Sequence, residues 1–291
     1  TFYTDTLFSK VKSMNGNTCA QVYSNGSFTK VFPMSDKTGA RVGQTLTDFA
    51  DDVGIPDTLV MDLAPEQAGK HTDMQKEARR LRVRIRFTEK GRSEQNHTAE
   101  GEIGQLKRRW KHRMTTKNVP RCLWDYGLVH EAEVLSILAR GKDQVPGLEK
   151  VLGQTIDISE YLNFGIWDLV WYWDQSKTSD MSDEQKKLGR WLGIAHRVGS
   201  EMTYWILTEH CKVIARSTVQ HVLFSDLQQE TVKAKATRFE RVIEESLRGR
   251  ETIVNVPNVF YLDDEDTPDG GNAFTPTNEE YGDMLQDEKP E

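Results

Sequence analysis

The strongest constraint on the fold is the order of the apolar segments in residues 1–87. Three short segments rich in aromatic and β-branched residues come first, and Asn15-Gly16 and Asn25-Gly26 stand between them. Such segments favour strands, and Asn-Gly favours a tight hairpin turn. Helical and strand patterns then alternate, which predicts an antiparallel meander extended by parallel strands. The expected strands are 2–8, 18–23, 28–34, 58–62 and 84–87, and the expected helices are 40–53 and 72–83.

The rest of the chain predicts further units, since 291 residues exceed one average domain. A helix within 93–114 and another over 123–138 would complete an α/β domain at 1–140, a mixed five-stranded sheet covered by helices. A linker is expected at 141–164. Tryptophan-rich segments at 166–173, 189–197, 203–208 and 213–222 predict a small all-β barrel over 165–224. We expect a helix over 225–250 and a disordered acidic tail over 251–291.

Charge is unevenly distributed along the chain. Residues 76–121 are strongly basic and residues 263–291 are strongly acidic, although the net charge is -7. This asymmetry is typical of a nucleic-acid-binding body with an acidic tail. A solvated helix face followed by a disordered tail explains the same pattern, and charge alone favours that simpler interpretation.

The cysteines and the hydropathy indicate in which kind of cellular compartment the chain is expected. Cys19, Cys122 and Cys211 are isolated, so neither a disulfide framework nor a zinc finger is predicted and a reducing compartment is expected. No apolar run approaches the ~20 residues of a membrane span, and no signal peptide is evident. The chain begins without an initiator Met, which suggests a piece of a longer protein.

Three acidic residues stand where the predicted elements begin or end. Asp5 lies in the first strand, Asp62 ends the apolar segment 58–62, and Glu100 opens a helix behind a polar loop. Open α/β sheets place ligand sites at strand ends, and carboxylates suit pairs of Mg²⁺ or Mn²⁺ ions that act on phosphodiesters. We predict that these three residues are catalytic and bind two such ions. The chain has 45 acidic residues, so chance selection is the alternative, and Glu102 is the substitute for Glu100.

The helix that follows Glu100 carries the candidate nucleic-acid contacts. On an ideal helix, Lys107 and Lys111 return to the angular position of Glu100. We therefore expect these lysines to bind phosphates beside the metal site. The further candidates on this helix and its preceding loop are Arg108, Gln95, Asn96 and His97, although a lone loop histidine is more often only solvated.

These residues resemble the integrases of copia-type LTR retrotransposons, which belong to the retroviral integrase superfamily with an RNase H-like core. The matching blocks are Tyr3-Thr4-Asp5, Asp62-Leu-Ala-Pro-Glu66 and Gln95-Asn-His-Thr-Ala-Glu100. Segments 188–195, 204–208 and 214–219 resemble the SH3-like barrel that follows such cores. Two departures are Leu63-Ala-Pro in place of the usual Asn-Gly-Gly, and Gly101 in place of a basic or polar residue.

The resemblance implies a polynucleotidyl transferase fragment of a retrotransposon polyprotein that joins element DNA ends to target DNA. It also implies a homo-oligomer and a nuclear location with cytoplasmic assembly. Two alternatives stay open: a catalytically decayed module that binds nucleic acid or chromatin, and an RNase H-like nuclease. Two interpretations are open for the conspicuous side chains of the barrel. The tryptophans at 167, 171 and 173 either fill its core, which is favoured, or contact nucleic acid. The arginines at 190, 197 and 216 are either ordinary surface residues or phosphate contacts.

Overall fold

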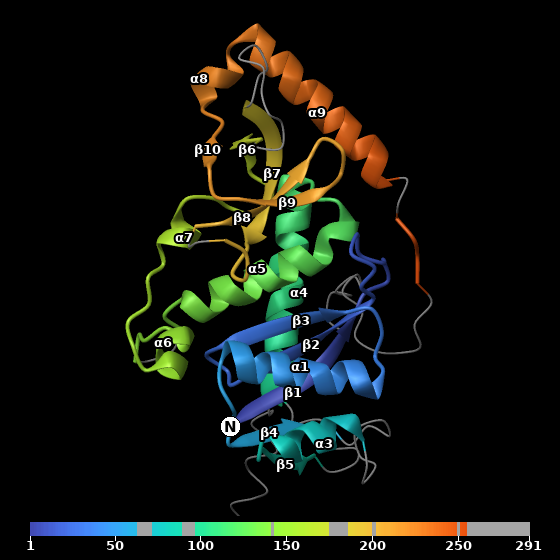
Figure 1. The fold of residues 1–291 in the computed structure, drawn as a ribbon, viewed down its shortest axis with the longest axis vertical. Coiled ribbons are helices and arrows are strands. Elements are labelled where there is room, and N and C mark those ends of the chain that lie inside the picture. The colour runs from blue at the N-terminus through green and yellow to red at the C-terminus, as the bar shows by residue number, and fades with distance from the viewer. Residues whose placement is uncertain are drawn as a thin grey trace, which may run out of the picture.

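The computed structural model describes residues 1–62, 72–88, 97–140, 143–174, 186–199, 202–248 and 251–254. A five-stranded sheet forms the centre of the first lobe (Figure 1), in the order β3-β2-β1-β4-β5. β1 is antiparallel to β2 and parallel to β4, so the predicted meander and mixed sheet are confirmed. The strands are β1 (Phe2–Phe8), β2 (Cys19–Ser24), β3 (Thr29–Met34), β4 (Thr58–Met61) and β5 (Arg84–Phe87).

The hairpin between β2 and β3 shows how local sequence sets this topology. The Asn25 side-chain oxygen accepts hydrogen bonds from the backbone N–H groups of Ser27 and Phe28, at 3.0 and 2.8 Å. Gly26 adopts φ +86°, which residues with a side chain rarely adopt. The turn therefore closes at the Asn-Gly pair, as the sequence predicts.

Helices cover both faces of the sheet. α1 (Gly39–Asp52) and α3 (Asp73–Arg80) lie on one face, where Leu46 and Phe49 of α1 pack with Leu59 and Met61 of β4. α4 (His97–Lys117) and α5 (Trp124–Ile137) lie on the other face, and they share a core with Leu7 of β1. Because neighbouring strand residues point to opposite faces, β1, β2 and β3 each contribute to both cores, whereas the core residues of β4 and β5 lie on the α1 side.

α4 and α5 approach each other closely at Gly127. A Cβ atom at this position would come within 2.0 Å of the Trp110 ring, so only glycine fits the contact. The same interface contains Glu131, which is fully buried and accepts hydrogen bonds from Arg109 and Arg113 at 2.7 and 3.0 Å. The pair of helices is therefore joined by a tight apolar contact and a buried ionic one.

The segment after α5 is more ordered than the linker predicted for 141–164. It contains two short helices, α6 (Gly147–Leu152) and α7 (Ser159–Leu162). Gly147 packs so closely against the β2–β3 turn that a Cβ would lie 2.0 Å from the Ser27 carbonyl oxygen. The difference from the prediction arises because glycine and proline in this segment serve contacts and caps as well as loops.

A second sheet forms the β lobe, with strand order β10-β6-β7-β8-β9 and antiparallel pairing throughout. The predicted all-β character is confirmed, whereas the barrel closure and the SH3-like type stay predictions. Trp171 is buried and Trp173 is 42% exposed. The strands are β6 (Leu169–Trp173), β7 (Lys186–Ile194), β8 (Tyr204–Thr208), β9 (Val213–Arg216) and β10 (Val219–His221).

The chain then returns to the first lobe. α8 (Phe224–Leu227) and α9 (Glu230–Arg248) follow β10, and α9 runs obliquely along one side of the β lobe in Figure 1. The Lys12 N–H donates to the Thr252 carbonyl at 2.9 Å, and the Val254 N–H donates to the Lys10 carbonyl at 2.8 Å. Residues 252–254 are therefore paired to the segment after β1, contrary to the tail prediction, and residues 255–291 lie outside the described part.

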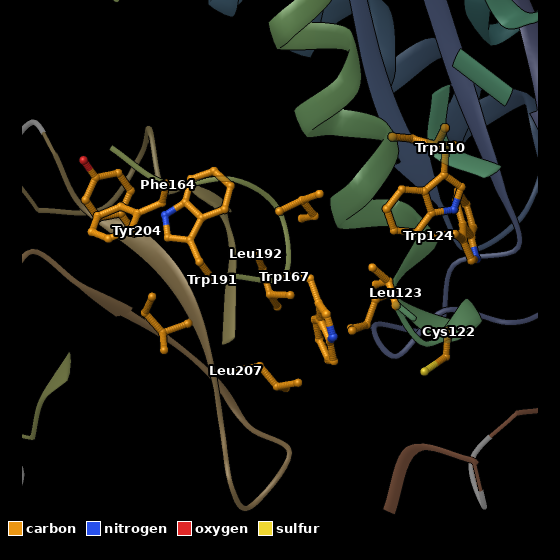
Figure 2. Packing of buried hydrophobic residues seen from close by; sticks show 14 of the residues in the cluster. Trp110, Cys122, Leu123, Trp124, Phe164, Trp167, Trp191, Leu192, Tyr204 and Leu207 are labelled. Carbon is orange, nitrogen blue, oxygen red and sulfur yellow. The ribbon is translucent and has the colours of Figure 1, made fainter. Parts of the chain in front are cut away.

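One hydrophobic core contains side chains from both lobes. It includes Trp110, Leu123 and Trp124 of the α/β lobe together with Trp167 and Trp191 from the β lobe. Figure 2 shows Trp167 between Leu123 and the residues of β7. The two lobes are thus packed together through apolar contact. Among the described helices, none combines the length and apolarity needed to cross a membrane.

Candidate metal and nucleic-acid site

The fold brings Asp5 and Asp62 to the same edge of the first sheet. Thr4 of β1 pairs in parallel register with Met61 of β4, and the two aspartates come next along each chain. Leu59 and Met61 face the α1 side, so the alternation of a strand places Asp62 on the opposite side, which α4 covers. Asp5 follows the same alternation as Leu7, whose side chain packs with α4 residues.

Asp5 is the most perturbed of the three acids. Its pKa is raised to about 6, mainly by burial and also by the neighbouring Asp62 and Glu100 carboxylates, while a hydrogen bond from the Thr6 N–H and the charge of Lys37 act in the opposite direction. The Thr6 N–H lies 2.7 Å from Asp5 Oδ1. Asp5 therefore senses both of the other predicted site residues.

Asp62 and Glu100 complete the cluster. Asp62 Oδ1 accepts a hydrogen bond from the Thr88 hydroxyl at 2.9 Å. The pKa of Glu100, near the start of α4, is raised by burial and by the Asp62 carboxylate, and the charge of His97 lowers it. The three predicted acids, from two strands and a helix, consequently share one electrostatic environment, which we call the acidic cluster (Asp5, Asp62 and Glu100).

The acidic cluster has the donor chemistry for hard divalent cations, which prefer carboxylate oxygens. Burial and neighbouring carboxylates raise the pKa values of Asp5 and Glu100, and a bound cation would favour their ionised forms. Within the described residues, however, no three His, Cys, Asp or Glu side chains already stand close enough to ligate one ion. The charge and the donor type of the acidic cluster fit a hard divalent cation.

Glu102, the substitute for Glu100, has a structural role. Its side chain is buried, both carboxylate oxygens lie 3.1 Å from Arg140 Nη1, and Oε2 accepts from the Thr29 hydroxyl at 3.0 Å. It joins α4 to β3 and to the segment that follows α5. A two-residue offset on the helix turns Glu102 away from Glu100, and a salt bridge satisfies it.

The basic residues of α4 divide into two groups. Arg109 and Arg113 neutralise the buried Glu131, and Lys117 pairs with Asp168 at 2.6 Å. Arg108 is exposed, and Lys107 and Lys111 are half-buried. The predicted contacts Lys107, Arg108 and Lys111 stay candidates for phosphate binding, and His97 begins α4. The predicted contacts Gln95 and Asn96 lie outside the described residues.

The arginines of the β lobe are engaged within the protein. Arg190 pairs with Glu240 of α9 at 2.6 Å, Arg197 pairs with Asp52 of α1, and Arg216 lies 3.7 Å from Asp174. Trp167 and Trp171 are buried, which agrees with their interpretation as core residues. The β lobe therefore presents fewer free contacts for nucleic acid than its composition suggested.

Sequence reasoning missed two residues that act on the acidic cluster. Lys37 lowers the pKa of Asp5 through its charge, and Thr88 donates to Asp62. Thr88 directly follows β5, which pairs in parallel with β4. Because parallel strands end at one edge of a sheet, the place of Thr88 directly after a predicted strand could have identified it from the sequence. Lys37 lies in the connection between β3 and α1, where sequence offers no such rule.

No protein-family model and no curated protein matches the chain. A chain in the structure of the simian T-cell lymphotropic virus intasome in complex with PP2A regulatory subunit B56 gamma is similar at 12% identity and a TM-score of 0.42, covering 76% of this chain and 78% of that one. The catalytic core domain of BIV integrase is similar at 14% identity and a TM-score of 0.37, covering 52% and 93%. Both TM-scores lie below 0.5.

Proposed function

We propose that this chain is an integrase-type polynucleotidyl transferase, a part of a retrotransposon polyprotein that inserts element DNA into target DNA. The observation that supports it most is that Asp62 and Glu100 both raise the pKa of Asp5, and Asp62 raises that of Glu100, although the three acids lie far apart in sequence. The sequence resemblance of the blocks around the same three residues supports the proposal independently.

The side chains have separable tasks in such a reaction. Asp5, Asp62 and Glu100 would hold two Mg²⁺ or Mn²⁺ ions, which when bound activate the attacking hydroxyl and stabilise the leaving oxygen. Asp5 must lose its proton to bind a cation, so binding should strengthen as pH rises through about 6. The Thr6 N–H and the Thr88 hydroxyl orient the two aspartates.

The proposed substrates are the ends of the element DNA and a target duplex. Lys107, Arg108 and Lys111 extend from the acidic cluster along α4, where they would bind backbone phosphates. A homo-oligomer that brings two DNA ends together, and a nuclear location after cytoplasmic assembly, belong to the same proposal.

A strand-transfer assay with a pre-cut donor end, a target duplex and Mg²⁺ tests the proposal. We expect Asp5→Asn, Asp62→Asn and Glu100→Gln each to reduce joined product by at least about a hundredfold, the scale for losing one group that stabilises the transition state. Glu209→Gln is the matched control, because it removes one carboxylate from an exposed turn of the β lobe. It should leave joining unchanged.

The outcomes separate the alternatives. Hydrolysed but unjoined DNA would favour the nuclease. Full joining by all three variants would refute the proposal. Mg²⁺ or Mn²⁺ should also raise the melting temperature of the wild-type chain and not that of Asp5→Asn, since a ligand stabilises the state to which it binds. No shift in either protein, together with retained DNA binding, would favour the non-catalytic module.

A further inference from the structure

A cavity of about 630 Å³ lies where the two lobes meet, apart from the acidic cluster. β3, α1 and α5 supply one side of it, and α7 and the β7–β8 region supply the other. Its lining combines aromatic side chains, among them Phe32, Tyr161 and Trp205, with several carboxylates. Volume and lining fall within the range of roughly 300–1,000 Å³ and the mostly apolar character of small-ligand sites.

Glu133 of α5 provides the unusual feature of this lining. It is 8% exposed, and its Oε1 accepts a hydrogen bond from His196 Nε2 at 2.9 Å. Its Oε2 is buried and has no hydrogen-bond partner among the described residues. A buried carboxylate oxygen without a donor costs free energy. A donor carried by a ligand would remove that cost.

The balance of charged side chains in the lining indicates the sign of the ligand's charge. The described lining holds four carboxylates, those of Asp48, Asp51, Asp52 and Glu133, and three basic side chains, those of Lys30, His196 and Arg197. Lys30 and Arg197 already pair with Asp52, and His196 bonds Glu133 Oε1. An excess of negative charge beside aromatic rings favours a positively charged ligand, because ring faces also attract cations.

We propose that this cavity binds an alkylammonium group, with the ammonium at Glu133 and the apolar stem against Phe32, Tyr161 and Trp205. An ammonium suits the site better than a guanidinium. Only one oxygen of Glu133 lacks a partner, whereas a guanidinium is best matched by two parallel acceptors. A lysine side chain of a peptide and a free alkylamine carry the same chemistry.

Such a ligand would touch both lobes. Glu133 belongs to α5 of the α/β lobe, whereas Trp205 belongs to β8. Direct polar links already cross this junction, at His196 with Glu133 and at Arg197 with Asp52. The ammonium ligand adds a third link and should therefore stabilise the packing of one lobe on the other.

Calorimetric titration of the full chain, without DNA or metal, tests the site. The probes are Nα-acetyl-lysine N-methylamide and its norleucine counterpart, which has a similar stem and no ammonium. We expect the lysine probe to bind about tenfold more tightly or better, and Glu133→Gln to remove that difference. Glu209→Gln, an exposed change in the β lobe, should leave binding unchanged.

A second variant tests the site independently in case Glu133→Gln fails to fold. A melting curve would reveal such a failure. Asp51→Asn alters an exposed residue at the cavity, and we expect it to weaken the lysine probe about two- to threefold. Equal binding of the two probes, or binding that neither variant weakens, would overturn the proposal. A third probe, n-pentylamine, identifies the source: binding as tight as the lysine probe indicates free amines, and weaker binding indicates peptide lysine.

Discussion

The carboxyl group of Asp5 ionises at a cost, because burial and two neighbouring acids favour its protonated form and raise its pKa from 3.8 to about 6. The folded state therefore holds this proton more tightly than the unfolded chain does. Stability falls as pH rises from about 4 through about 6, and the loss persists at higher pH. This is the opposite of a salt-bridged carboxylate, whose ionisation stabilises the fold.

Asp5→Asn should consequently stabilise the protein at pH 7.5 while it abolishes joining activity. The gain is at most about 3 kcal/mol, from roughly two pKa units at about 1.4 kcal/mol each. It should vanish near pH 4, where Asp5 is protonated in both states. Urea unfolding of both proteins at the two pH values measures it. A variant less stable than the wild type at pH 7.5 would show that the Asp5 carboxylate is compensated.

Two basic residues on α4 illustrate how similar side chains differ in role. Arg113 donates to the fully buried Glu131, whereas Lys111, two residues earlier, lies on the half-buried part of the helix. Removal of a partner from a buried carboxylate is costly, and removal of a lysine at the surface is not. The fold thus assigns one residue to stability and leaves the other for a ligand.

Arg113→Ala should lower the free energy of unfolding by about 1–3 kcal/mol. Lys111→Ala should change it by less than about 0.5 kcal/mol, yet weaken DNA binding and reduce the salt dependence by roughly one phosphate contact. Denaturation together with binding at several salt concentrations checks both. An unchanged salt slope in Lys111→Ala would remove this lysine from the interface.

At the scale of elements, the contact between α4 and α5 depends on one glycine. A Cβ at Gly127 would overlap the Trp110 ring, while a Cβ at Gly101, also inside a helix, meets no atom within 4 Å. Helix propensity favours alanine equally at both positions, by about 1 kcal/mol. Packing alone therefore distinguishes the two substitutions.

We expect Gly101→Ala to stabilise the chain by about 0.5–1 kcal/mol. Gly127→Ala should destabilise it by about 1–3 kcal/mol, because the helices must separate to admit the methyl group. Thermal and urea unfolding of the two variants give the comparison directly. If both substitutions stabilised the chain, α4 and α5 would not be in close contact in solution.

For the whole molecule, the shared hydrophobic core and the pairing of residues 252–254 with the segment after β1 tie the lobes together. Two lobes that share buried tryptophans lose their common core if either one unfolds. We therefore expect a single cooperative transition in calorimetry, with equal calorimetric and van't Hoff enthalpies. Two separated transitions would show that the lobes unfold independently.

Much of the fold could be predicted from the sequence, because its signals are local. The aromatic and β-branched residues of β1, the apolar run of β4, the Asn25-Gly26 turn and the helical spacing in α1 each depend on residues within a few positions of one another. The same patterns placed Asp5 in the first strand, Asp62 at the end of a strand and Glu100 near the start of a helix, and the structure has them there, while their role as a catalytic site stays a prediction.

Only the tertiary structure decided which charged side chains pair within the protein and which are available to a ligand. Glu131 lies 22 residues from Arg109 and Glu102 lies 38 residues from Arg140 along the chain, and no local pattern specifies such pairs. The same holds for Thr252, which bonds Lys12 at the opposite end of the described chain. Periodicity determines which face a side chain occupies, whereas the partner on that face depends on how the elements pack.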